Sequence, residues 1–497
     1  MFPFLTVLIA LPVVGAALLW ALPASARTKA REIALGVTVA EAALFVVMAL
    51  QFDKADAGAI QFAETHAWIP QIGASWALGV NGLGLLMIAL SVILVPLAIL
   101  AGWREETDAT RRRNYMALVL LGQAFMVGIF AARDVFLFYV LFEAMLVPLY
   151  FLIGGFGGAQ RRYAAVKFLL YSLVGGLIML VAVVALYFVG EGGEQAFLID
   201  NLTGMEMSST TERLLFLGFF LAFAIKAPMV PLHTWLPTVA EEARPGTTAL
   251  LVAVLDKIGT FGMITLCLTM FPNASQWAAP VIIVLAVISV IYGALLAIGQ
   301  KNMMRLVAFT SVSHFGVMIL GIFAFQQTSM EGAALYMFNH GLSTAALFFL
   351  VGFLIERTGS ADLADYGGLQ RVIPVFAGSF LIVGMSAAAL PGLSPFVSEI
   401  MVFIGAYPVA KAAVIVSAIS VVLAALYILL TYKKVFTGPV LEGSEGTREM
   451  TLREKLVAWP LIVAMLVLGF LPGLAIDYVR EPAADAVAYV AIEEANA

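Results

Sequence analysis

Apolar runs of about twenty residues recur from one end of this chain to the other. Each run is long enough to cross a hydrocarbon core of ~30 Å as a helix. Only helices and closed barrels satisfy their backbone inside a membrane, and runs that are continuous rather than alternating favour helices. The chain is also 62% hydrophobic, with a mean hydropathy of +1.01. The pattern predicts an all-α membrane protein of about fourteen spans, at 3–22, 31–50, 78–102, 114–131, 134–153, 166–189, 213–236, 246–270, 278–298, 305–325, 332–355, 374–405, 411–436 and 456–476.

The first apolar run could be mistaken for a signal peptide, because the Ala24-Ser25-Ala26 stretch behind it resembles a cleavage site. A signal peptide carries basic residues in front of its apolar run. Here the first basic residue, Arg27, follows the run. We therefore expect a retained first helix.

Basic residues are distributed unevenly among the predicted loops. Of the 27 lysines and arginines, twenty lie in or beside loops that follow odd-numbered spans, five in the other loops and the tails, and two inside spans. Cytoplasmic loops carry an excess of lysine and arginine. The distribution predicts that both termini lie on the outer side of the membrane.

Four charged residues lie in the middle of apolar stretches: Glu143, Lys226, Lys257 and Glu399. A charge at the centre of a membrane helix costs roughly 2.5–3.5 kcal/mol on insertion scales, so such residues face a protein interior or water. At ~4 Å and an effective dielectric constant of about 20, an ion pair contributes about 4 kcal/mol before desolvation. Glu143 is the expected partner of Lys226. The charges indicate a path for protons or ions, and the structural alternative is a static salt bridge.

Two spans are interrupted by proline close to one of these charges. Proline removes a backbone donor and clashes with the preceding turn. Non-helical backbone at membrane depth is tolerated only inside protein or along water. The interrupting residues are Pro228, Pro231 and Pro237 in span 7, and Pro391, Gly392 and Pro395 in span 12.

The interruptions also suggest an internal repeat. Spans 4–8 and 9–13 form two five-helix blocks, each with its broken helix in fourth position. An odd number of spans per block gives opposite orientations, as in the inverted repeats of transporters; prolines coinciding by chance are the alternative. The predicted organisation is N-terminal helices at 1–110, a first antiporter-like repeat at 111–270, an inverted second repeat at 271–437, and a last helix with its tail at 438–497.

Three histidines, His233, His314 and His340, lie in or near spans and suit a proton relay, because histidine titrates near neutral pH. A structural hydrogen bond is the alternative role for each. A haem held by His314 and His340 lacks any supporting pattern. Asp256 is a weaker candidate: it points about 100° away from Lys257 on a helix and faces either a second interior surface or the cytoplasmic side.

The only cysteine is Cys267, which excludes an internal disulfide and a four-thiolate cluster. No GxGxxG fingerprint opens a βαβ unit, and there is no GxxxxGK[ST] loop. We expect no cofactor in this chain.

Several stretches resemble the antiporter-like membrane subunits of respiratory complex I. The sequence D-V-F-L-F-Y-V-L-F-E around Glu143 resembles the span 5 signature of the M-type subunit. K-A-P-M-V-P-L-H-T-W-L-P at Lys226 and D-K-I-G-T-F-G-M at Lys257 resemble the core shared by the L, M and N types. Glu399, in P-G-L-S-P-F-V-S-E, stands where the M type has glutamate and the other two have lysine. The stretch V-A-E-E-A-R-P-G-T-T departs from the family by lacking a loop histidine, which puts a loop contribution to proton entry in doubt.

The resemblance implies a proton-translocating subunit of a bacterial-type plasma-membrane NADH–quinone oxidoreductase. Glu143 would pair with Lys226, Lys257 would continue through His314 and His340, and Glu399 would lie at the outlet. NADH, FMN, iron–sulfur clusters and quinone would be held by partner subunits. The expected neighbours are lipid and the L and N subunits, and no nucleic acid.

Two other functions compete with this one. A multi-subunit cation/proton antiporter without electron-transfer partners would have similar helices and lysines. A structural scaffold would use the charges only to lock helices together. The wording of spans 5 and 12 favours the complex I subunit.

Overall fold

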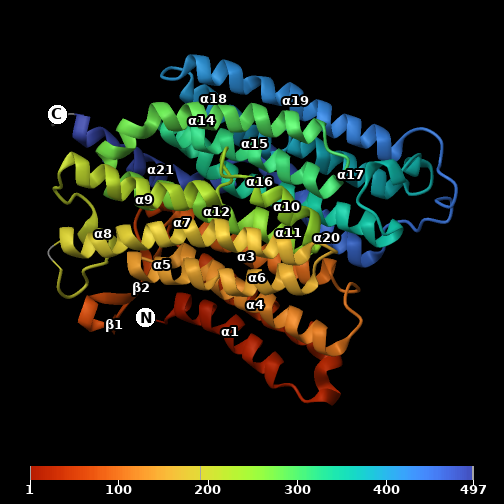
Figure 1. Cartoon of the computed structure of the whole chain (residues 1–497), viewed down its shortest axis with the longest axis horizontal. Helices are drawn as coiled ribbons and strands as arrows, with labels where there is room; N and C mark the ends of the chain where they lie inside the picture. Colours follow the sequence, from red (N-terminus) through yellow and green to blue (C-terminus); the bar gives the residue numbers. More distant parts are fainter. Residues whose placement is uncertain (1, 191, 495–497) are drawn as a thin grey trace.

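The computed structural model describes residues 2–190 and 192–494. Its helices lie side by side, and the connecting loops gather at two opposite ends (Figure 1). Within the described residues, eleven helices are long and apolar enough to cross a membrane, and the pair α20–α21, bent by 69°, makes a twelfth. The expected all-α multi-pass architecture is confirmed. The nine straightforward spans are α1 (Phe4–Ala21), α2 (Ala30–Ala49), α3 (Gly82–Ala101), α4 (Ala109–Ala131), α7 (Arg161–Val189), α14 (Pro272–Ile298), α15 (Met303–Phe323), α16 (Gln327–Thr358) and α19 (Lys411–Phe436).

Both interruptions predicted from proline are present. Span 7 consists of α9 (Ser209–Lys226) and α10 (Trp235–Glu242), and span 12 consists of α17 (Pro374–Ala387) and α18 (Ser394–Ala406). Counted as one crossing each, these pairs bring the twelve candidate spans to the predicted fourteen. Each break leaves helix ends at membrane depth beside a buried charge, Lys226 or Glu399.

Two other spans are irregular in ways that the sequence did not predict. Span 5 is interrupted after Glu143, where α5 (Val135–Ala144) gives way to α6 (Leu146–Phe156). Span 8 has widened π-helical turns on both sides of Lys257, a feature frequent at functional sites. Its segments are α11 (Pro245–Leu250), η4 (Leu251–Leu255), α12 (Lys257–Gly262), η5 (Met263–Cys267) and α13 (Leu268–Met270).

The structure corrects two boundaries. The predicted start of span 3 at residue 78 is wrong, because an antiparallel hairpin of β1 (Gln61–Ile69) and β2 (Ala74–Val80) comes first. Asn81 then caps α3 by accepting from the Gly84 amide at 3.1 Å. The predicted end at residue 476 is also wrong, because α20 (Leu452–Phe470) bends into α21 (Gly473–Glu494). The short elements are η1 (Ala24–Lys29), η2 (Lys54–Asp56), η3 (Pro70–Ile72), α8 (Ile199–Leu202), η6 (Leu363–Asp365) and η7 (Leu369–Arg371).

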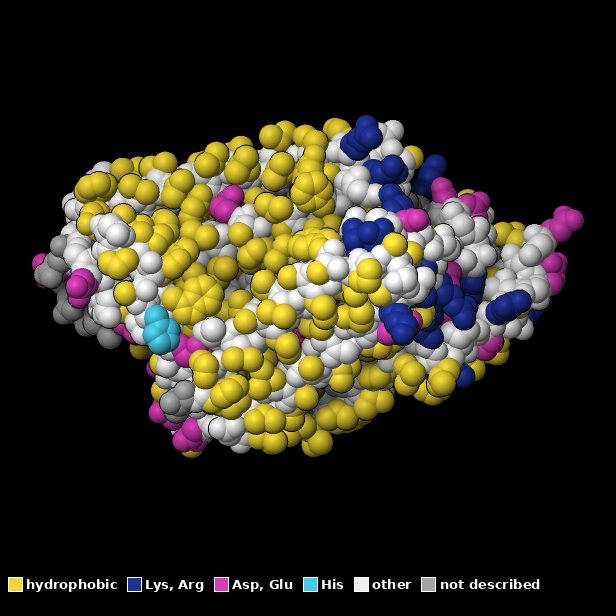
Figure 2. Space-filling model, turned by 90° about the horizontal axis from the view of Figure 1, so that it is seen from below, with side chains coloured by type: hydrophobic (Ala, Val, Ile, Leu, Met, Phe, Trp, Pro, Cys, Tyr) yellow, Lys and Arg dark blue, Asp and Glu magenta, His cyan; other side chains and the backbone are white. Residues whose placement is uncertain are grey.

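The helices differ in how far they are buried, and the basic residues are concentrated at one end of the bundle. α15 and α16 are almost entirely enclosed by other helices, whereas most residues of α7, α14 and α19 are at least partly exposed. Figure 2 shows hydrophobic side chains over most of one face, with the lysines and arginines gathered toward one end. The start of α1 and the end of α21 both lie toward the opposite end, apart from one another (Figure 1), which agrees with an even number of crossings.

Candidate functional site

Lys226 is the last residue of α9 and is 1% exposed. The chain leaves the helix there because Pro228 cannot continue it. The ammonium lies 3.4 Å from the hydroxyl of Ser172 on α7 and about 5 Å from two ring centres, at 5.2 Å from Phe142 and 5.1 Å from Phe168. An ammonium over an aromatic face is stabilised by the ring quadrupole. Two aromatic rings and one hydroxyl group thus lie around the ammonium of Lys226 deep in the bundle.

Glu143 lies near the end of α5 and is half-buried. No ion pair within 4.0 Å joins it to Lys226, although the two are electrostatic neighbours. Its carboxylate instead lies against Gly176 of α7, where a methyl group would overlap Oε1. That oxygen is buried without a hydrogen-bond partner. The direct pair expected from the sequence is therefore absent in this conformation.

Asp256 lies at the junction between the first widened turn and α12. It is 1% exposed, and neither carboxylate oxygen has a hydrogen-bond partner. Gly259, on the same helix face, packs so closely on the end of α9 that an added Cβ would come within 2.5 Å of the Ala227 amide nitrogen. This face therefore points toward Lys226. Asp256 is an electrostatic neighbour of both Lys226 and Lys257.

Lys257, the next residue, points the other way and is fully buried. Its ammonium donates to the carbonyl of Val252 at 2.9 Å and lies 2.7 Å from Nδ1 of His340 on α16. It also lies 4.5 Å from the ring centre of Phe315. The widened turn before Lys257 lets its side chain reach back to the Val252 carbonyl. Adjacent residues of one helix thus face two different parts of the bundle.

The two histidines expected as a relay are in contact. The rings of His314 and His340 are 5.1 Å apart between centres and nearly perpendicular, at 78°. Nε2 of His340 is 3.0 Å from the hydroxyl of Thr344, and Nε2 of His314 is 3.5 Å from the hydroxyl of Tyr427. Direct contact between the rings leaves no room for a haem between them. A proton-relay arrangement fits the geometry and a haem site does not.

Glu399 lies in the first half of α18, just after the second break, and is 5% exposed. Its Oε2 accepts a hydrogen bond from Tyr336 of α16 at 2.9 Å. The Tyr336 ring also lies 5.9 Å from His314. Asn339 holds α18 against α16 by donating to the Ser394 carbonyl at 3.0 Å.

Tyr336 was not singled out from the sequence. It precedes His340 by four residues, so the two share one helix face, and that spacing was the available signal. We name the set of buried ionisable and polar residues described above the buried polar line. Its members are Lys226, Asp256, Lys257, His340, His314, Tyr336 and Glu399.

His233 lies outside this line. It is in the break between α9 and α10, 4% exposed, with its ring 5.4 Å from that of Tyr292 and 6.2 Å from that of Phe309. No described contact joins it to the line. Among the described residues, no group of three His, Cys, Asp or Glu could hold a metal ion.

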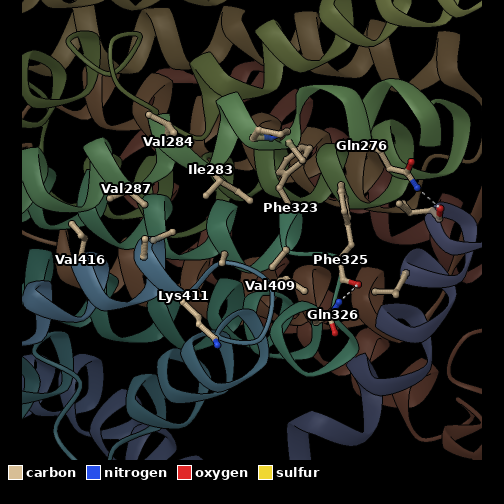
Figure 3. Close-up of a pocket in the computed structure, with 18 of the residues that line it drawn as sticks. Gln276, Ile283, Val284, Val287, Phe323, Phe325, Gln326, Val409, Lys411 and Val416 are labelled. Atoms are coloured by element: carbon tan, nitrogen blue, oxygen red, sulfur yellow. Dashed lines mark hydrogen bonds between the residues drawn. The ribbon is translucent and has the colours of Figure 1, made fainter. Parts of the chain in front are cut away.

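A cavity of about 860 Å³ lies apart from the line, at one end of the bundle (Figure 3). Apolar side chains such as Ile283, Val287 and Val416 make up most of its wall, and Gln276 and Lys411 add polar groups. No member of the buried polar line is among its lining residues. The chemistry of the line is therefore enclosed by protein rather than built around this opening.

A profile of the family described as "NADH:quinone oxidoreductase/Mrp antiporter, TM" matches residues 132–426, which include every predicted site residue. The chain belongs to this family. NADH-quinone oxidoreductase subunit M of Mycobacterium tuberculosis is 45% identical over 96% of this chain and 93% of its own length. The match confirms the resemblance drawn from the sequence.

Solved structures of family members share the fold. A chain of respiratory complex I from Thermus thermophilus is 31% identical, with a TM-score of 0.88 over 98% of this chain and 99% of that one. A chain of the Mrp complex from Dietzia sp. also has a TM-score of 0.88, over 98% of each chain, at 23% identity. The second likeness shows the fold alone, so it does not favour an antiporter function.

Proposed function

We propose that this chain is the proton-translocating M-type membrane subunit of NADH-quinone oxidoreductase and that protons move along the buried polar line. The observation that carries the proposal is the series of neighbouring groups from the Lys257 ammonium to the Glu399 carboxylate. Hydrogen bonds join Lys257 to His340 and Tyr336 to Glu399, and the rings of His340, His314 and Tyr336 pack on one another between them. The identity to M-type relatives supports the assignment to this enzyme rather than to an antiporter without electron-transfer partners.

The first transfer in the line is from Lys257 to His340. The charged lysine donates to Nδ1, and the neutral histidine keeps its other proton on Nε2, toward Thr344. Transfer gives a neutral lysine and a charged histidine whose ring contacts His314. Glu399, reached from His314 through the Tyr336 hydroxyl, is the acceptor at the far end. Each proton moved across the membrane works against about 2.3 kcal/mol per 100 mV.

Asp256 couples the two lysines. One carboxylate cannot neutralise two ammonium groups, so the charge of Lys226 sets how strongly Asp256 favours a proton on Lys257. When Lys226 is charged, it takes part of the electrostatic stabilisation that Asp256 provides. Lys257 then holds its proton less strongly and becomes a better donor to His340. The charge of Lys226 would therefore control the transfer of a proton from Lys257, in the first block, to His340, in the second.

Glu143, which is not a member of the buried polar line, would control the charge of Lys226, its first member. Glu143 lies against Gly176 of α7, and among the described residues its Oε1 has no hydrogen-bond partner. Approach of its carboxylate would favour the charged form of Lys226, and withdrawal would favour the neutral form. We infer that redox energy released in partner subunits drives this displacement.

The surroundings of the chain follow from the same proposal. The five-helix blocks at 111–270 and 271–437 would be inverted repeats, each supplying one broken helix. The end of the molecule rich in lysine and arginine would face the cytoplasm of a bacterial-type cell, with both termini outside. The L and N subunits and lipid would surround the chain. NADH, FMN, iron–sulfur clusters and quinone would belong to partner subunits.

The test uses the complex purified in gentle detergent and reconstituted into vesicles. We expect flavin-containing, NADH-oxidising partners to copurify. We expect Lys257→Met to lower the number of protons taken up per NADH oxidised, and Lys411→Met, at an exposed lysine, to leave it unchanged. An assembled Lys257→Met complex that pumps at the normal ratio would overturn the proposal. Absent partners would favour the antiporter, and a defect confined to assembly would favour the scaffold.

A further inference from the structure

A further charged residue lies inside a membrane span and is not a member of the buried polar line. Glu41 is in the middle of α2 and is 0% exposed, although most residues of α2 are at least partly exposed. It belongs to the single stripe that α2 turns toward α1, α3 and α4, and Thr38 precedes it by one turn. The buried residues of this stripe are Ala30, Ala34, Thr38, Glu41, Phe45 and Met48.

Helices α2 and α4 begin side by side and run in the same direction. Arg27, just before α2, donates to the hydroxyl of Thr110 in the first turn of α4 at 3.2 Å. Arg112 of α4 donates to the carbonyl of Thr28 at 3.4 Å. These two bonds fix the register between the helices at the end of the molecule where lysine and arginine gather.

A second contact fixes the register further along. A Cβ added at Gly15 of α1 would lie 2.9 Å from Val37 on α2 and 3.0 Å from Leu120 on α4, so Val37 and Leu120 share one level. Glu41 follows Val37 by four residues, and Gln123 follows Leu120 by three. At 1.5 Å per residue, Glu41 and Gln123 differ in height by about 1.5 Å. Gln123 is also 0% exposed, so both side chains lie in the interior at one level.

No charge is available to balance an ionised Glu41. Helices α1 and α3 contain no charged residue. The charged residues of α2, α4 and the segments that flank them lie near the helix ends, two turns or more from Glu41. At one end they include Arg27, Lys29, Arg31, Glu32, Arg111, Arg112 and Arg113, and at the other they are Asp53, Lys54, Asp56, Arg133 and Asp134, with Glu64 bonded to the start of α1. Among the described residues, neither oxygen of Glu41 and neither terminal atom of Gln123 has a hydrogen-bond partner.

We propose that Glu41 and Gln123 form a proton-binding site in the first four helices, in which Glu41 is a neutral carboxylic acid that donates its proton to Oε1 of Gln123. A dry interior disfavours an unpaired carboxylate, because burying its charge is costly. A neutral carboxylic acid and an amide can instead satisfy each other's hydrogen-bonding groups. The site is separate from the buried polar line and holds a proton whether or not the line is active.

A metal cation fits less well than a proton. The site offers two oxygens of Glu41, one of Gln123 and the hydroxyl of Thr38, which already donates to the carbonyl of Leu35 at 3.0 Å. Hard cations such as calcium and magnesium take about six oxygens or more. The oxygens present are enough to bind a proton, whereas a metal cation would require more oxygen ligands than the site offers.

The experiment compares infrared spectra of the purified, assembled complex with those of Glu41→Gln, without turnover. We expect the substitution to remove a C=O band of a neutral carboxylic acid and to leave the carboxylate bands unchanged. The matched control is Glu32→Gln, at an exposed residue of the same helix, which should remove carboxylate bands instead. Gln123→Leu should move the Glu41 band to the frequency of an acid without a hydrogen bond.

Two results would overturn the site. Loss of carboxylate bands in Glu41→Gln would show that Glu41 is ionised. Conversion of the wild-type acid band to carboxylate on adding sodium would show that the site takes a cation. Should Glu41→Gln not assemble, Glu41→Asp replaces it, and the position of the new aspartate band, among neutral acids or among carboxylates, decides in the same way. Proton pumping does not enter these readouts.

Discussion

The ammonium of Lys257 lies 2.7 Å from Nδ1 of His340, and both side chains are fully buried. The two residues come from spans 8 and 11 and are 83 positions apart in sequence. Their contact places a proton donor and a proton acceptor within hydrogen-bond distance at the centre of the bundle, where a proton can pass between them without crossing water. The contact also decides where Lys257 points, which is away from Asp256.

Replacing His340 tests this contact. We expect His340→Ala to lower NADH-driven proton uptake by roughly 10²-fold or more, because positioned acid–base groups contribute on that scale. Proton uptake into vesicles, measured against NADH oxidation, gives the readout. His66→Ala, at an exposed histidine of β1, should have no effect. Normal pumping by the first variant would remove His340 from the line.

Asp256→Asn tests the coupling between the lysines. The amide keeps the shape of the side chain but removes the charge that acts on both ammonium groups. We expect the complex to assemble and the proton-per-electron ratio to fall. The matched control is Asp477→Asn, whose side chain is 55% exposed. An unchanged ratio would mean that Lys226 and Lys257 communicate without Asp256.

Gly176→Ala tests the place of Glu143. The added methyl group would overlap the Glu143 carboxylate and push it from its site on α7. We expect slower pumping, measured as in the other variants, with assembly retained. Gly155→Ala is the control, because a methyl group there meets no atom within 4 Å. If both variants pump normally, the resting position of Glu143 does not matter.

Glu106 gives a prediction about pH and stability. It lies in the loop between α3 and α4 and accepts from Arg111 at 3.0 Å and from Arg244 at 2.9 Å. Burial by itself raises the pKa of Glu106, but the hydrogen bonds from Arg111 and Arg244 outweigh it and hold the pKa below its usual value. The stabilisation is therefore present at neutral pH and is lost as pH falls through the lowered pKa.

Glu106→Gln should accordingly lower the thermal stability of the complex at neutral pH, since hydrogen bonds to charged groups contribute about 1.5–3 kcal/mol. The difference from wild type should shrink in acid, which thermal unfolding across a pH series would measure. Glu445→Gln, at an exposed glutamate of the loop before α20, is the control. A difference that persists in acid would exclude the ionic origin. Arg244 belongs to the stretch that departs from the family, so this contact gives that departure a structural role.

Much of the architecture follows from local pattern. The length of each apolar run decides that it spans, and Pro228 and Pro391 decide where helices break, because both effects act within one turn of the chain. The hairpin at 61–80 escaped prediction because its last strand, Ala74–Val80, contains no charged residue and leads almost directly into the apolar helix that follows. The widened turns around Lys257 also carry no local signal that separates them from ordinary helix.

The sequence by itself determined that Glu143, Lys226, Lys257 and Glu399 must be enclosed, since a charge exposed to lipid is too costly. Only the tertiary structure decided which groups meet. Rotation and register of packed helices, set by close approaches such as that of Gly259 to Ala227, turn Lys257 to His340 and keep Glu143 from Lys226. The same packing encloses Glu41 with Gln123. Side-chain direction on a buried helix depends on its neighbours, and that information lies far away in the chain.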